Sequence, residues 1–120
     1  MEVPILKQGH VLIASVQAAL TDADLLQMRA AVVERVVKNR ARAVIVDVTS
    51  LDVMDSFATR TLRDIAQMIR LRGAETVIVG IQPDVAFAMV QLGAKLEGVA
   101  TALDLEEGLE YLERRTKTGK

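Results

Sequence analysis

The sequence contains no cysteine and no tryptophan, and His10 is its only histidine. Without cysteine there are no disulfides, no thiolate catalysis and no cysteine-based zinc site. Only Phe57, Phe87 and Tyr111 are aromatic, so few side chains can stack on nucleic-acid bases. The 15 basic and 16 acidic residues leave a formal net charge of −1. Charge therefore gives no reason to expect DNA, RNA or an anionic membrane as a partner.

A long apolar run is also missing. No run reaches the roughly 18 residues that span a membrane, and the N-terminus has no basic-then-apolar signal pattern. We therefore expect a cytoplasmic protein. Its 120 residues fit a single domain over 1–120, with residues 116–120 as a disordered tail. Because 51% of the residues are hydrophobic and so few are aromatic, we expect an aliphatic core.

Strands and helices are predicted to alternate along the chain. Residues 3–7 and 11–16 read as two short strands joined by a turn at Gly9. The runs "AVIVDV" and "TVIVGI" are typical of strands buried on both faces, and a weaker strand is predicted at 99–103. Helices are predicted after Thr21, over about 55–72, from Pro83 to Gly93, and from Asp104 onward. This order predicts an α/β fold: a mixed β-sheet with an N-terminal hairpin and later parallel strands, packed with about four α-helices.

The loop "DVTSLDVMD", after the first buried strand, collects polar groups where open parallel sheets carry their sites. Asp47, Asp52 and Asp55 offer oxygen ligands of the kind that Mg²⁺ prefers. The alternative is that Asp55 caps the next helix while Asp47 and Asp52 bond loop amides. We favour the second interpretation, and we expect no metal and no cofactor.

Ser56 lies where the second helix is predicted to begin, and its role has two interpretations. A serine there commonly caps the helix through its hydroxyl. The same hydroxyl could accept a phosphate, because free backbone N–H groups and the helix dipole favour an anion at that position. Physical chemistry alone favours the plain cap.

Catalytic signals are absent from the rest of the sequence. His10 has no acid–base partner near it in sequence, and no nucleophile-elbow, Walker or Rossmann motif is present. We therefore expect no enzymatic activity. The helix "PDVAFAMVQLG" has almost no polar face. Either it is wholly buried, or one side, carrying Phe87 and Met89, is exposed as an assembly surface.

Two stretches, "AVIVDVTSLDVMDSFATR" and "TVIVGIQPDVAFAMVQLG", resemble the STAS domain family in their order and spacing, and the resemblance covers nearly the whole chain. This fold occurs in anti-sigma-factor antagonists and in the cytoplasmic tails of sulfate transporters. In the antagonists a partner kinase phosphorylates the serine of a D-S-x-G-L motif, and Ser56 falls on that serine. The residues that follow, "FATR", depart from the motif. They are more similar to the stressosome branch, and within it to subunits that consist of a STAS domain alone, the RsbS type.

The resemblance implies a non-enzymatic stressosome scaffold that sequesters a serine/threonine switch kinase and releases it when Ser56 is phosphorylated. It also implies a resetting phosphatase, homodimerisation, and a large shell shared with a sensory STAS paralogue. Thr59 is a weaker phosphosite candidate. The implied partner-binding loop contains Asp52, Asp55, Phe57 and Arg60. Two alternatives stay open: a free antagonist of an anti-sigma kinase, and a nucleotide- or ligand-binding STAS domain.

Overall fold

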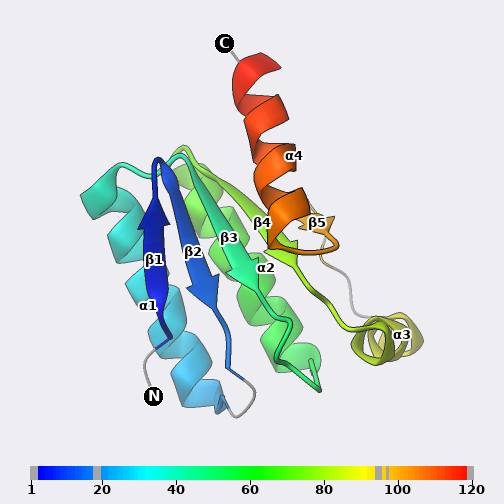
Figure 1. Ribbon diagram of the computed structural model, residues 1–120. Helices are drawn as coiled ribbons and strands as arrows, with labels where there is room; N and C mark the ends of the chain where they lie inside the picture. Colours follow the sequence, from blue (N-terminus) through cyan, green and yellow to red (C-terminus); the bar gives the residue numbers. More distant parts are fainter. Residues whose placement is uncertain (1–2, 18–19, 94–95, 97, 119–120) are drawn as a thin grey trace.

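The computed structural model describes residues 3–17, 20–93, 96 and 98–118 (Figure 1). Four helices and five strands alternate along these residues after an initial hairpin, which confirms the predicted α/β fold. The elements are β1 (Ile5–Gln8), β2 (Val11–Ser15), α1 (Asp22–Asn39), β3 (Ala43–Asp47), α2 (Ser56–Leu71), β4 (Glu75–Val79), α3 (Pro83–Leu92), β5 (Ala100–Ala102) and α4 (Leu105–Thr118).

The five strands form one sheet in the order β1-β2-β3-β4-β5. Strands β1 and β2 are antiparallel, and every later pair is parallel. Helices α1 and α2 lie side by side on one face of the sheet, while α4 lies on the other (Figure 1). Each parallel crossover passes through a helix, so the carboxyl ends of β3 and β4 meet at one edge of the sheet.

Apolar side chains of alternating strand residues fill two separate cores. In β3, Val44 and Val46 pack with α1 and α2, whereas Ala43 and Ile45 pack on the α4 side. This alternation explains why the strand reads as an unbroken apolar run, because both of its faces are buried. On the α4 side the helix approaches the sheet closely at Gly108, where an added Cβ would lie 2.7 Å from Val79 Cγ1.

The last helix begins after Asp104, as predicted. Asp104 Oδ1 accepts a hydrogen bond from the Glu107 backbone N–H, as expected of a cap, but Glu107 Oε1 accepts from Leu103 N one residue further out. Helix α4 extends to Thr118 and so includes the first three residues of the tail predicted from residue 116, while 119–120 lie outside the described residues. Within the described part of the chain, no helix is long and apolar enough to cross a membrane.

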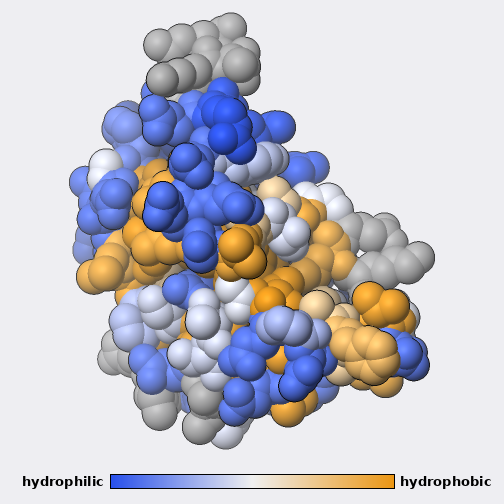
Figure 2. Space-filling view, turned by 45° about the vertical axis from the view of Figure 1, so that its right-hand side comes forward, coloured by the Kyte–Doolittle hydropathy of each residue, from blue (hydrophilic) through white to orange (hydrophobic). Residues whose placement is uncertain are grey.

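Helix α3 divides its apolar residues between the core and the surface. Val85 and Met89 are buried in the same core as residues of α1 and α2, because their spacing of four residues places them on one side of the helix. Met89 therefore does not lie on the exposed side that one of the two interpretations gave it together with Phe87. Phe87 is 66% exposed, and Figure 2 shows apolar side chains gathered at the lower right, over α3. The other large apolar residues exposed on α3 are Val90 and Leu92.

Candidate phosphoacceptor site at the start of helix α2

The loop that leads into α2 is fixed at its start by the turn that follows β4. Asp47 and Val79 are register partners at the ends of β3 and β4, so the residues after them come together. Asp47 Oδ1 accepts hydrogen bonds from Thr49 N (2.9 Å) and Thr49 Oγ1 (2.6 Å). Gln82 Nε2 donates to the Thr49 carbonyl at 2.6 Å. The Asp47 bonds hold the start of the loop, and the Gln82 bond ties it to the β4–α3 turn.

Gly80 makes this close approach possible. Its φ of +81° is a left-handed conformation that favours glycine, and an added Cβ would lie only 2.0 Å from Thr49 Oγ1. Gly80 and Gln82 were not predicted as site residues. They lie beside Thr49 because β3 and β4 pair in parallel register. The sequence signal that could have indicated this is position: Thr49 lies just beyond the end of β3, and Gly80 and Gln82 lie just beyond the end of β4.

The middle of the loop alternates between buried and exposed side chains. Leu51 and Met54 are buried in the core, with exposed fractions of 7% and 3%. Between them, Asp52 and Val53 are exposed. Two apolar anchors therefore hold the loop against the domain, and Asp52 is presented to solvent in a fixed place.

Helix α2 is capped by Asp55 and not by Ser56. Asp55 has an extended backbone conformation, and its Oδ1 accepts a hydrogen bond from Ala58 N at 2.8 Å. Ser56 is the first helical residue and its side chain is exposed. The interpretation of Ser56 as a plain helix cap is therefore wrong, because the Asp55 carboxylate already accepts the hydrogen bond from Ala58 N that a cap residue accepts. Among the described residues, the Ser56 hydroxyl has no hydrogen-bond partner.

The surroundings of Ser56 carry both signs of charge. The exposed carboxylates Asp52 and Asp55 precede it, and Arg60 follows one helical turn later, exposed on the same face. The N–H groups of the first helical turn have no partners within the helix and favour an anion, as does the helix dipole. Phe57 is half-buried and packs against the core, so it anchors the start of the helix.

The two threonines that follow Ser56 face the interior. Thr59 and Thr61 are each only 3% exposed. Thr61 Oγ1 donates to the Phe57 carbonyl at 2.8 Å, whereas Thr59 Oγ1 is buried without a partner among the described residues. The folded domain thus does not present Thr59 to an enzyme. Ser56 is the one exposed hydroxyl in the first two turns of α2.

Metal binding finds little support in this loop. The Asp47 and Asp55 carboxylates are each used in a local hydrogen bond. In the part of the chain that the structure describes, no group of three or more His, Cys, Asp or Glu side chains is arranged to hold a metal ion. His10 is exposed at the β1–β2 turn.

The match to known proteins agrees with this architecture. A family model of the STAS domain covers residues 2–107. The chain belongs to the STAS domain family. This membership confirms the family resemblance that the two sequence stretches indicated.

Similar proteins include an RsbR protein, an RsbS protein and a chain of the stressosome. The chain is 33% identical over 75 residues, or 62% of its length, to the RsbT co-antagonist protein RsbRA of Bacillus subtilis (strain 168), and it spans only 27% of that relative. It is 30% identical to an RsbS of Moorella thermoacetica that carries a serine-to-glutamate substitution, with a TM-score of 0.83 over 96% of this chain and 97% of that one. A chain in "Molecular architecture of the stressosome, a signal integration and transduction hub" is 32% identical, with a TM-score of 0.81 and coverage of 94% and 98%.

Proposed function

We propose that this STAS domain is a non-enzymatic stressosome scaffold that holds a serine/threonine switch kinase and releases it when Ser56 is phosphorylated. The observation that carries the proposal is the exposed, unpartnered Ser56 hydroxyl at the first position of α2, beside a loop fixed by Asp47, Thr49 and Gln82. Full-length similarity to an RsbS and to a stressosome chain supports the same role.

The proposed switch acts through charge at an exposed surface. Phosphorylation would add nearly two negative charges at Ser56, next to Asp52 and Asp55. The free N–H groups of the first turn and the guanidinium of Arg60 would stabilise the phosphate without unfolding α2. Because Leu51 and Met54 anchor the loop, the modification would change the charge of the surface more than its shape. Repulsion of even ~1.4 kcal/mol across an interface weakens binding tenfold.

The partners belong to the same proposal. We expect a sensory STAS paralogue in a shared hetero-oligomeric shell, homodimerisation, and a phosphatase that removes the phosphate from Ser56. A free antagonist of an anti-sigma kinase would use Ser56 in the same way but would stay small. Sedimentation with and without the paralogue separates these roles, since only a scaffold joins a large particle with it.

The direct test is phosphorylation by a serine/threonine switch kinase from the same organism. The protein is incubated with the kinase and ATP, and the modified residue is identified by mass spectrometry. We expect a single phosphate on Ser56 and none on the Ser56→Ala variant. Because Thr59 is buried, Thr59→Val should be modified as fast as the wild-type chain. Modification at another residue in the Ser56→Ala variant, at the wild-type rate, would overturn the proposed site.

A further inference from the structure

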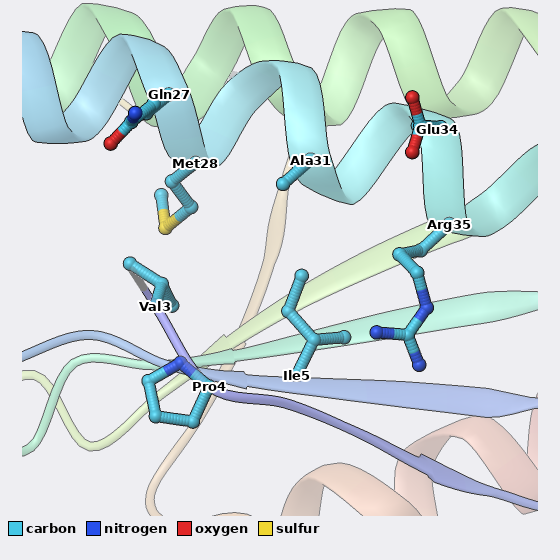
Figure 3. Close-up of a pocket in the computed structure, with 8 residues that line it drawn as sticks. All are labelled: Val3, Pro4, Ile5, Gln27, Met28, Ala31, Glu34 and Arg35. Carbon is cyan, nitrogen blue, oxygen red and sulfur yellow. The ribbon is translucent and has the colours of Figure 1, made fainter. Parts of the chain in front are cut away.

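A groove separates helix α1 from the edge strand β1, and it is not part of the Ser56 site (Figure 3). Its volume is about 540 Å³. The lining combines an apolar surface with polar groups at its ends. The apolar residues are Val3, Pro4, Ile5, Met28 and Ala31, and the polar residues are Gln27, Glu34 and Arg35.

Strand β1 borders this groove, and among the described strands only β2 pairs with it. The Pro4 carbonyl accepts a hydrogen bond from Ser15 N, so the carbonyl of Pro4 points toward β2. Since bonding groups alternate along an antiparallel pair, the N–H and C=O groups of Ile5 and Lys7 point away from the sheet. An extended chain could therefore pair with β1 and direct alternate side chains into the groove.

The charges around the groove distinguish the possible occupants. Figure 3 shows the Arg35 side chain extending toward β1 beside Ile5, whereas the Glu34 carboxylate, which also lines the groove, stays close to α1. Lys7 follows Ile5 by two residues and so lies on the same face of the strand. A second copy paired through β1 would bring the cations of both copies together. An acidic segment would instead meet opposite charge.

We propose that the groove between β1 and α1 binds an extended, acidic segment of a partner protein as an additional strand on β1. One apolar side chain of that segment packs on Ile5 and the exposed Ala31, and a carboxylate contacts Arg35. Backbone pairing with Ile5 and Lys7 supplies affinity, and the carboxylate selects acidic partners. On the opposite face of the sheet, the next residue of the segment covers Leu6, which is 65% exposed.

A synthetic peptide tests this proposal. The probe is a short capped peptide in which valine and threonine alternate around one central glutamate, and the control peptide has lysine in place of the glutamate. Binding to the isotope-labelled protein is followed by amide chemical shifts and by hydrogen exchange. We expect saturable shifts in β1 and the groove side of α1, and slower exchange at the amides of Ile5 and Lys7. The lysine peptide should bind at least tenfold more weakly.

Two charge-reversal variants on α1 make the test specific. Arg35→Glu should weaken the glutamate peptide about tenfold or more and improve the lysine peptide, whereas Arg29→Glu, outside the groove, should change neither. Equal binding of both peptides, or an equal effect of the two variants, would overturn the proposal. Concentration-dependent shifts in β1 without peptide would also overturn it, because they indicate that a second copy binds there. So would displacement of the peptide by the fatty acid decanoate without slower amide exchange in β1, because that indicates a small-molecule pocket.

Discussion

The contact between Gly80 and Thr49 predicts that adding one methyl group at residue 80 loosens the loop that carries Ser56. Gly80 has a φ of +81°, and an alanine Cβ there would lie 2.0 Å from Thr49 Oγ1, 3.1 Å from its Cβ and 3.2 Å from its Cα. The Cα belongs to the backbone, so rotation of the threonine side chain cannot fully relieve the clash. Either the loop or the β4–α3 turn must move.

The expected cost of Gly80→Ala has two parts. A left-handed conformation costs a residue with a Cβ about 1–2 kcal/mol. Displacing Thr49 adds about 1–3 kcal/mol of overpacking, and it weakens the hydrogen bonds of Thr49 to Asp47 and Gln82. Together the variant should lose about 2–5 kcal/mol of unfolding free energy, measured by urea denaturation with circular dichroism.

Gly73→Ala is the matched control for this experiment. Its φ is +88°, but an added Cβ there meets nothing within 4 Å. The control should therefore lose only the conformational part, about 1–2 kcal/mol. The loss at Gly80 should shrink when Thr49→Ala removes the nearest atom. Equal losses for Gly80→Ala and Gly73→Ala, with no relief from Thr49→Ala, would refute the inferred contact.

Three further predictions concern α2 and α4, and each is checked by the same unfolding measurement. Asp55→Ala should lower the free energy of unfolding by about 1 kcal/mol because it removes the cap, while Ser56→Ala should change it by less than about 0.5 kcal/mol. A larger loss for Ser56→Ala would contradict the assigned cap. Thr59→Val should raise stability by about 1 kcal/mol, since it replaces a buried hydroxyl that has no partner; a clear loss would show that the hydroxyl is satisfied. Gly108→Ala should lower the free energy of unfolding by about 1 kcal/mol, because the clash with the buried Val79 outweighs the gain in helix propensity. A more stable variant would mean that α4 can move off the sheet.

The elements that local patterns specify could be predicted from the sequence. The β-branched runs of β3 and β4 predict strands covered on both faces, and Gly93 ends α3 with a left-handed φ of +71° as expected. The family resemblance placed attention on Ser56. The resemblance did not establish which residue caps α2. Asp55 and Ser56 are adjacent and both are strong cap residues, so only the backbone conformation decides which of them is the cap.

Features that depend on tertiary packing were not predictable in the same way. Met89 and Phe87 are two residues apart on a nearly all-apolar helix, so the sequence could not tell which side faces the core. The link between Thr49 and Gln82 joins residues 33 positions apart. It follows only from the parallel pairing of β3 with β4, which a local pattern does not specify.

The central claim is that negative charge at Ser56 releases a bound kinase. The most direct measurement is the affinity of the switch kinase for this domain, unmodified and phosphorylated on Ser56, by calorimetric titration at one salt concentration. The account predicts that the phosphorylated domain binds at least tenfold more weakly, that Ser56→Asp shows part of the loss, and that Ser56→Asn binds like the wild-type chain. Equal affinity of the unmodified and phosphorylated domains would contradict it.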